Sequence, residues 1–414
     1  MLKKLIVPFS VLTLLAVLVG GCKPAATPAP KPAAATPVPA AGIPYGGVIK
    51  IGNVAPMTGD IPKVGEDGDN GVKLALDEIG YKLKVGDQTY TIKYLLEDNE
   101  SKAESAVAAT TKLIKEDKVL ALIGAYASKQ AVPMGEVANR YKCPDISPWS
   151  TNPRTTKNRP YVFRACFIDP FQGRVGARYI KETWPDVKKV AVLYDVASDY
   201  PKGLAEEFKA GCEEVGLEVV AFETFTTKDR DFSSQLTKII NSGAQLLYTP
   251  QYYDEVPLIV KQAKELGWDK IIFGSDSWAG GDLASLCGDD CVGYRFTTHY
   301  AMVGAKGKTK KFIDAFKAKY GYEPSDVGAL AYDAAQILLE AIKNTGGLTG
   351  DLEKDRDAIK DQLGAIKEWK GVTGTMNFTP EGDPIKCAVI CEYNKEHKFE
   401  LVDWACPAGV PKPE

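Results

Sequence analysis

Histidine is scarce in this chain of 414 residues and occurs only at His299 and His397. Two isolated histidines leave little for histidine-based acid–base catalysis or for a zinc site that needs paired imidazoles. The sequence also has no phosphate-binding P-loop, no nucleophile elbow and no dinucleotide fingerprint. These absences argue against an enzyme, and we expect no cofactor and no metal.

Concentrated charge of one sign is also lacking. The chain has 51 Lys and Arg against 54 Asp and Glu, with a net charge of −3 and the two signs interspersed. Proteins that bind nucleic acid usually present a basic patch, so we expect no nucleic-acid partner. A length of 414 residues with 45% hydrophobic residues allows ordinary cores and two or three domains.

A long hydrophobic run occurs at the N-terminus, from Leu5 to Val19, behind Lys3 and Lys4. A short apolar core that follows basic residues and ends in small residues is typical of an export signal. The ending Val-Gly-Gly-Cys resembles the bacterial lipobox, which predicts a lipoprotein signal peptide over residues 1–21 and lipidation of Cys22. The protein would then be exported and lipid-anchored to the cell membrane, facing the periplasm or the cell exterior. A plain secretory signal and an uncleaved anchor are the alternatives.

A tether is predicted to follow, over residues 22–45. Between Lys23 and Pro44 the composition is almost entirely Ala, Pro, Thr and Lys, with seven prolines. Such a segment cannot bury a core and behaves as a semi-rigid spacer. At about 3.1 Å per residue it would let the folded part stand roughly 70 Å from the membrane.

A glycine-rich loop is expected between the first strand, Val48–Val54, and a helix from about Asn70 to Ile79. The segment Gly65–Gly71 has acidic residues that invite comparison with a calcium-binding loop. It fails in detail, because Gly71 occupies the position of an oxygen ligand and Val72 the position of the required glycine. Its glycine spacing does not fit a dinucleotide site either.

Buried β-branched strands then alternate with amphipathic helices on both sides of Pro170. This alternation is typical of parallel sheets covered by helices, and the repeated unit indicates two similar lobes. Three helices and a terminal strand hairpin in the last quarter predict that the chain crosses between the lobes more than once, as in a multi-strand hinge. The predicted class is α/β, with two doubly wound parallel-sheet lobes; the predicted bounds are 46–167 with 301–372 for the first lobe and 168–300 with 373–414 for the second.

Two hydroxyl residues, Ser128 and Thr151, follow successive predicted strands, Val119–Ile123 and Asp145–Pro148. In an open α/β sheet, ligands bind beyond the carboxyl ends of the strands. A helix is expected from about residue 131 to residue 141, and its free N–H groups suit an anion. We therefore expect an anion site here; the alternative is that Ser128 only caps its helix and Thr151 only ends a turn.

Three residues occupy similar places in the second half. Tyr200, Tyr252 and Asp276 each follow a predicted strand. A carboxylate that faces a hydroxyl-and-amide anion site across a cleft is what an α-amino acid zwitterion requires. Each ligand charge that leaves water needs a partner, at a cost of roughly several kcal/mol if none is found. The alternative is that Asp276 caps a loop and the tyrosines are core aromatics.

Eight cysteines remain beside Cys22, and export permits disulfides. Cys287 and Cys291 are close enough for a local bridge. Cys406 can pair with either Cys387 or Cys391 across the terminal hairpin. The remaining cysteines, at 143, 166 and 212, are expected to be buried thiols.

The chain from about Gly47 to Cys406 resembles the leucine/isoleucine/valine-binding protein family, whose members are type I periplasmic binding proteins that serve ABC importers. The resemblance rests on motifs in matching order: IGNVAPMTGDIPKVGEDGDNGVKLALDEI, LIGAYASKQAVPMGEVA, ISPWSTNP, VFRACFIDPFQG, KVAVLYDVASDYPKGLAEEF, DFSSQLTKI, YTPQYYDEVPLIVKQAKELG and FGSDSWAG.

This resemblance implies a set of ligand contacts. The family's carboxylate-binding serine and threonine match Ser128 and Thr151, and the residue matching Trp149 contacts the ligand through its backbone. The acid that holds the ammonium matches Asp276, and the enclosing aromatic rings match Tyr200 and Tyr252.

Two positions depart from the family's pattern. Trp149 stands where leucine binders carry a small residue, and Val64 stands where an aromatic residue is common. Trp278 is a further candidate for the pocket wall. The head-group site therefore matches the family, whereas the side-chain pocket differs.

The principal hypothesis is an extracytoplasmic lipoprotein, expected to be a monomer, that captures a branched-chain or similar apolar amino acid between its lobes. It would deliver this ligand to an ABC permease. The alternatives are the same fold with a small amide, a urea-like compound or an aromatic acid as ligand, and a sensory receptor.

Overall fold

The computed structural model describes residues 42–407, 410 and 412. The predicted signal peptide, Cys22 and most of the predicted tether lie outside the described residues. The end of the predicted tether contributes to a short 3₁₀ turn, η1 (Pro44–Gly47). None of the helices in the described part combines the length and the apolar character that a membrane crossing needs.

The first sheet has six strands in the order β2-β3-β1-β4-β5-β6. Five strands run parallel, and β2 pairs antiparallel with β3 through a tight hairpin. The strands are β1 (Val48–Ala55), β2 (Lys82–Val85), β3 (Gln88–Asp98), β4 (Ala121–Gly124), β5 (Asp145–Ser147) and β6 (Val162–Arg164), and the intervening helices are α1 (Pro62–Glu78), α2 (Ala103–Lys115) and α3 (Ser128–Arg140). Strand β4 is buried at every position, as its apolar sequence predicts.

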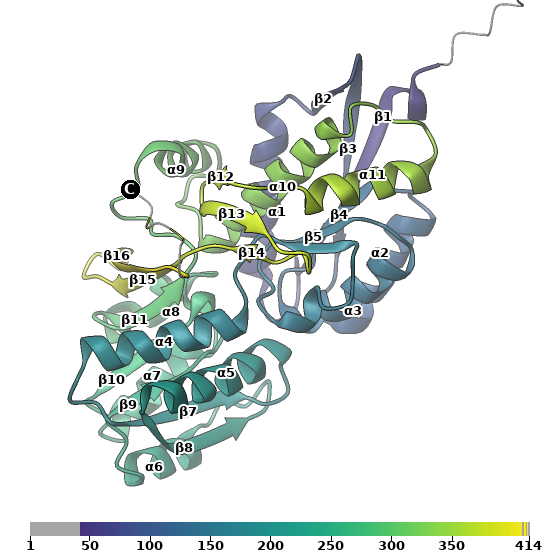
Figure 1. Cartoon of the computed structure of the whole chain (residues 1–414). Helices are drawn as coiled ribbons and strands as arrows, with labels where there is room; N and C mark the ends of the chain where they lie inside the picture. Colours follow the sequence, from purple (N-terminus) through teal and green to yellow (C-terminus); the bar gives the residue numbers. More distant parts are fainter. Residues whose placement is uncertain (1–41, 408–409, 411, 413–414) are drawn as a thin grey trace, which may run out of the picture. The chain divides into compact units, whose positions relative to one another are not determined.

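The second sheet has seven strands in the order β16-β15-β11-β10-β9-β7-β8. Strands β7 to β11 run parallel, and the terminal hairpin β15–β16 adds two antiparallel strands. Helices α4 and α5 lie side by side (Figure 1). The elements are α4 (Asp169–Thr183), β7 (Lys189–Asp195), α5 (Asp199–Val215), β8 (Glu218–Phe225), α6 (Ser233–Asn241), β9 (Leu246–Tyr248), α7 (Val256–Glu265), β10 (Ile271–Gly274), η3 (Asp276–Trp278), α8 (Leu283–Cys287), η4 (Gly288–Cys291), β11 (Arg295–Thr298), β15 (Ala388–Tyr393) and β16 (Phe399–Ala405).

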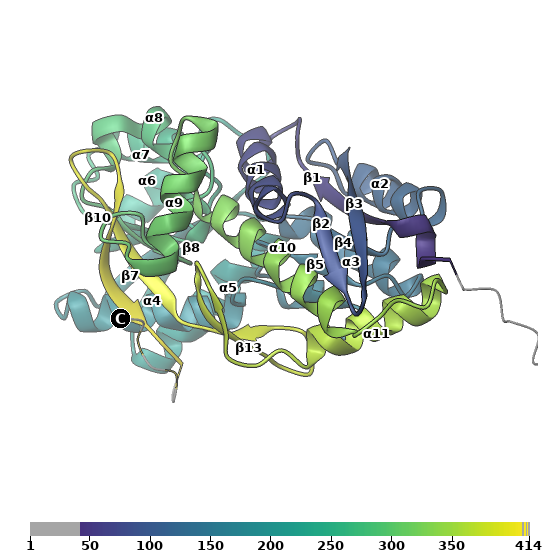
Figure 2. The same ribbon diagram turned by 90° about the horizontal axis from the view of Figure 1, so that it is seen from above.

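The chain returns to the first sheet after β11. Helix α10 packs lengthwise against α1 (Figure 2), and it also contacts strands of the first sheet. The returning elements are α9 (Gly307–Tyr320), α10 (Asp326–Asn344) and α11 (Leu352–Gly364), followed by a small antiparallel sheet of β12 (Trp369–Gly371), β13 (Gly374–Phe378) and β14 (Pro384–Ile385). The predicted α/β class with two doubly wound sheets is confirmed.

The glycine-rich segment is helical, so the prediction of a loop over Gly65–Gly71 was wrong. Helix α1 begins at Pro62 and contains Gly65, Gly68 and Gly71 at a spacing of three residues. An added Cβ at Gly65 would lie 2.3 Å from the Pro56 carbonyl oxygen, and one at Gly71 would lie 2.2 Å from the Gly328 carbonyl oxygen. Glycine at these positions therefore lets α1 pack closely against neighbouring backbone.

Replacing Gly71 with alanine is expected to destabilise the fold by about 1–3 kcal/mol. The new methyl group would meet the backbone of α10, which cannot move aside as a side chain can. This cost opposes the roughly 1 kcal/mol that alanine gains in a helix. Urea unfolding measures the difference.

Gly176→Ala in α4 is the matched control, because its Cβ would meet neighbouring atoms only at 3.4 Å or more. We expect this variant to be as stable as the parent chain or more stable. Equal stability changes for the two variants would contradict the packing explanation.

Two disulfides are present among the described residues. Cys287 is bonded to Cys291, as predicted. Cys387, and not Cys391, is bonded to Cys406. The other cysteines in this part of the chain are buried thiols, which confirms the prediction for positions 143, 166 and 212.

Candidate ligand-binding site

A small cavity, too tightly closed to hold a water molecule, lies at the carboxyl ends of strands from both sheets. Its lining consists of Ala127, Ser128, Trp149, Tyr200, Tyr252 and Asp276. Five of the six predicted site residues thus surround one cavity, although their positions range from 128 to 276 in the sequence. Ala127 is the additional member.

One wall of the cavity is built for an anion. Ser128 is the first residue of α3 and is only 1% exposed, and its hydroxyl accepts a hydrogen bond from Ser150 at 2.9 Å. Among the described residues, no side chain caps this helix end. The first N–H groups of α3 and the positive end of its dipole can therefore serve a carboxylate.

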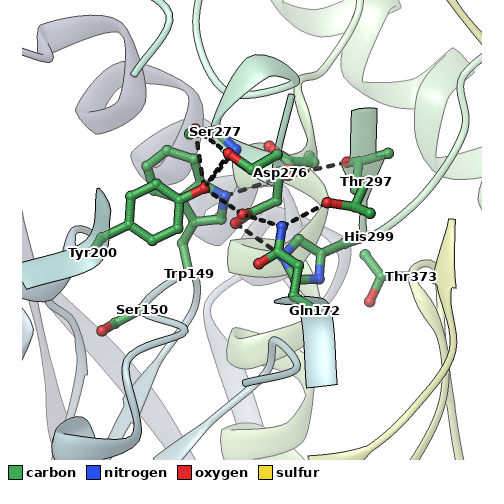
Figure 3. A network of polar contacts seen from close by, with 12 residues as sticks. Trp149, Ser150, Gln172, Tyr200, Asp276, Ser277, Thr297, His299 and Thr373 are labelled. Carbon is green, nitrogen blue, oxygen red and sulfur yellow. Dashed lines mark hydrogen bonds and ion pairs between the residues drawn. The ribbon is translucent and has the colours of Figure 1, made fainter. Parts of the chain in front are cut away.

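The opposite wall carries Asp276, which is 1% exposed. Its Oδ1 accepts hydrogen bonds from the Tyr200 hydroxyl at 2.6 Å and from Gln172 Nε2 at 2.7 Å (Figure 3). The Gln172 amide also donates to Thr297 at 2.8 Å. These contacts hold the carboxylate in one orientation with no Lys or Arg ion pair among the described residues, so a cationic group on a ligand would be its natural partner.

Asp276 belongs to a wider buried polar cluster. His299 Nε2 lies 3.4 Å from Asp276 Oδ2, and one potential ligand atom each from Asp276, His299 and Asp326 lie within 4.8 Å of one another. Burial lowers the pKa of His299 to about 4, so its ring is neutral at pH 7. Burial, followed by the charge of Asp276, raises the pKa of Asp326. This group is where a metal ion could be held, although each carboxylate already accepts hydrogen bonds from protein donors.

The aromatic rings of Trp149 and Tyr252 form the remaining walls. The ring centroids of Trp149 and Tyr252 are 6.0 Å apart, and those of Tyr200 and Tyr252 are 5.4 Å apart. The Trp149 indole N–H donates to Asp326 Oδ2 at 3.3 Å. Aromatic walls suit the apolar part of a ligand, while the polar atoms at either end fix its orientation.

Thr151 and Trp278 do not line the cavity. Thr151 is fully buried, and its hydroxyl lies beside Asp169. Burial raises the pKa of Asp169 to about 8, an effect that the Thr151 hydroxyl opposes. The Trp278 indole N–H donates to the Thr249 carbonyl at 3.2 Å, so this ring packs in the core.

Three residues of this region were not predicted: Gln172, His299 and Asp326. Gln172 and Asp326 come from the first turns of α4 and α10, not from strand ends. For Gln172 and Asp326, the sequence signal was a polar residue at the start of a helix. For His299, it was the rarity of histidine in this chain. Tyr200 was predicted, but it lies in the first turn of α5 and not in a loop.

A larger depression adjoins the small cavity, and both are lined by Ala127 and Tyr252. Its other lining residues are mostly polar or charged and include Asp60, Lys129 and Glu255. The two hollows are therefore neighbours.

Several comparisons with known proteins bear on this site. A periplasmic binding protein family model matches residues 48–398. The Pseudomonas aeruginosa leucine-, isoleucine-, valine-, threonine- and alanine-binding protein is 30% identical over 81% of this chain and 87% of its own length. Such proteins are solute-binding proteins and not enzymes.

Solved structures agree with this match. The leucine-binding protein LivK of Thermotoga maritima is 33% identical, with a TM-score of 0.81 over 87% of this chain and all of that one. LivJ of Streptococcus pneumoniae, solved with isoleucine, is 32% identical, with a TM-score of 0.76 over 86% of this chain and 99% of that one. Given this fold and the family match over residues 48–398, the chain belongs to the periplasmic binding protein family, in the group of the leucine/isoleucine/valine-binding proteins.

Proposed function

We propose that this protein binds a free α-amino acid outside the cytoplasm and delivers it to an ABC importer. The observation that carries the proposal is the opposition of Ser128 and Asp276 across one buried cavity. A helix end that suits an anion shares this cavity with a carboxylate that has no Lys or Arg partner among the described residues, which is the arrangement a zwitterion needs.

The ligand carboxylate is assigned to Ser128 and the start of α3. We also assign the hydroxyl of Thr151, the residue after Ser150, to the carboxylate site; it lies beside Asp169 in this structure and would have to turn toward the ligand on binding. Trp149 would contribute its backbone to the ligand and its ring to the cavity wall. All of these groups are at most 3% exposed, so a bound carboxylate would be withdrawn from water.

The ligand ammonium is assigned to Asp276, with Tyr200 holding the carboxylate in place and Tyr252 covering the ligand. Gln172 can take part as well, because its buried Oε1 has no hydrogen-bond partner among the described residues. An ammonium has three N–H donors, and Asp276 together with Gln172 would supply acceptors for two of them.

Capture requires that the cavity open. We propose that residues 46–167 with 301–372 move as one lobe against residues 168–300 with 373–414, so that the ligand enters through the larger depression. Binding would favour the closed state because the ligand contacts both lobes only there.

Export and anchoring complete the proposal. Related proteins are periplasmic, and the N-terminal residues predict a signal peptide with lipidation at Cys22. A lipid anchor with a tether of about 20 residues would keep a monomeric binding protein near its ABC permease in the membrane.

Calorimetric titration of ligand-stripped protein with the common amino acids tests the proposal. We expect saturable heat and a raised melting temperature with at least one amino acid. Absence of both effects with every amino acid would contradict it.

A second candidate ligand is an aromatic acid, and the aromatic cavity walls favour it. A solute-binding protein of Rhodopseudomonas palustris solved with benzoate shares the fold at 23% identity and a TM-score of 0.78. Benzoate has no ammonium, so Asp276 would remain a buried charge without a cationic partner. Including benzoate, a simple amide and urea in the titration separates these ligands from amino acids.

One exposed ion pair joins the proposed lobes. Arg154 Nη1 lies 2.9 Å from Asp199 Oδ1, and Asn152 donates to the Asp199 carbonyl at 2.9 Å. Arg154→Ala is expected to accelerate ligand release by up to about five-fold, because exposed pairs contribute about 0.2–1 kcal/mol. Stopped-flow dissociation measures this rate.

Lys142→Ala is the control, since its exposed pair with Glu353 joins two elements of the same proposed lobe. We expect no change in its release rate. Equal acceleration in both variants would argue against a role of the Arg154 pair in closure.

A further inference from the structure

The Trp149 ring is fixed at one edge of the cavity. Its indole N–H donates to Asp326 Oδ2, which also accepts from the Thr298 hydroxyl at 3.3 Å. Both Trp149 and Asp326 are buried. Any movement of the ring away from Asp326 would leave the buried indole N–H without its acceptor, so the ring cannot yield cheaply to a large ligand.

Gly280 makes room for this ring. A Cβ at position 280 would lie 2.5 Å from Trp149 Cζ2 and 2.9 Å from Cη2. Gly280 has no positive φ, so backbone conformation does not require glycine there. Close approach of the indole is therefore the structural reason for glycine at position 280, which shows that the ring is packed on that face.

The head-group contacts leave little space for a side chain. Ser128, Tyr200 and Asp276 supply polar atoms to the two ends of a zwitterion, so only Ala127, Trp149 and Tyr252 remain to face its side chain. Trp149 and Tyr252 are large rings 6.0 Å apart. Protein interiors tolerate added methylenes poorly when neighbours cannot move, so each methylene of a ligand side chain that reaches the fixed indole is costly to accommodate.

We propose that Trp149, held by Asp326 and Gly280, makes this a site for small amino acids, such as glycine, alanine and serine, and excludes leucine and isoleucine. The proposal rests on the amino acid binding proposed above and assigns its substrate class. Asp326 acts as a positioning residue, since it reaches the ligand only through the indole.

The test is calorimetry with glycine, alanine, serine, leucine and isoleucine on ligand-stripped protein. For the parent chain we expect alanine to bind at least 100-fold more tightly than leucine. Trp149→Ala should raise leucine affinity at least ten-fold and lower alanine affinity, because pocket contacts to single methylenes are worth about 10- to 200-fold each. Trp149→Phe, which keeps an aromatic ring and guards against misfolding, should give an intermediate ratio.

Two further variants examine how the ring is held. Asp326→Asn keeps an oxygen acceptor for the indole and should preserve the alanine-to-leucine ratio, whereas Asp326→Ala should reduce it. Trp184→Ala removes a half-buried tryptophan that does not line the cavity and should leave the ratio unchanged.

The outcomes separate this inference from the proposed function. Leucine binding as tight as alanine binding in the parent chain, or an unchanged ratio in folded Trp149→Ala and Trp149→Phe, would overturn the size restriction while amino acid binding stood. Absence of binding by every amino acid in the parent chain and in the variants would overturn both.

Discussion

Replacing Asp276 with asparagine is expected to weaken amino acid binding by roughly two to four orders of magnitude. The ligand ammonium would then lie in a buried site without an opposing charge, and breaking such a pair costs about 3–5 kcal/mol. The Gln172 and Tyr200 donors would still have an oxygen to contact, so the fold should remain intact. Calorimetric affinity and a melting curve measured on the same sample separate the two effects.

Asp314→Asn is the matched control, because Asp314 is an exposed acid in a surface pair with Lys310. We expect no change in affinity there. Asp276→Glu keeps the charge and should retain part of the binding. Unchanged or tighter binding after Asp276→Asn would rule out an ammonium partner and favour a neutral or anionic ligand such as benzoate.

Replacing Asp169 with asparagine is expected to flatten the pH dependence of stability between pH 5 and pH 8. Burial raises the pKa of Asp169 to about 8, so the folded state holds a proton that the unfolded state has already released above pH 4. The free energy of unfolding of the parent chain therefore falls as pH rises through this window, by an amount on the order of 3–4 kcal/mol for this group.

Urea unfolding at pH 5 and pH 8 measures this fall. Glu255, whose pKa burial raises to about 8, contributes in the same direction in both proteins. His299 has a lowered pKa and acts in the opposite direction. Because its ring gains a proton more readily in the unfolded state, the free energy of unfolding falls as the pH drops from 6.5 toward 4. The difference in pH dependence between the parent chain and Asp169→Asn isolates the contribution of the Asp169 carboxyl. If the free energy of unfolding fell equally in both proteins from pH 5 to pH 8, the raised pKa of Asp169 would be refuted.

Much of the fold was predictable because the pattern of buried strands is local. The strand predicted at Val48–Val54 is β1 (Val48–Ala55), and the strand predicted at Asp145–Pro148 is β5 (Asp145–Ser147). The error at α1 had a different origin: three glycines that usually indicate a loop are required by neighbours such as Gly328, which are distant in the sequence. Strands β2 and β11 were missed because short, partly polar strands carry a weak signal.

The candidate site was predictable where a polar residue follows a buried strand. Ser128 and Asp276 come directly after β4 and β10, and the two sheets bring them to one cavity. Gln172 and Asp326 start helices on other parts of the chain, and only the three-dimensional arrangement brings them to Asp276. The roles of all these residues in ligand binding remain predictions.

The terminal hairpin has a consequence for synthesis. Strand β15 is hydrogen-bonded between β11 and β16, and a disulfide links Cys387 to Cys406. The second sheet therefore lacks two of its seven strands until residues 388–405 have left the ribosome. A sheet that is completed late delays folding of this part of the chain. Late folding suits export, because an unfolded chain can pass through a narrow secretion channel before its cysteines are oxidised to disulfides.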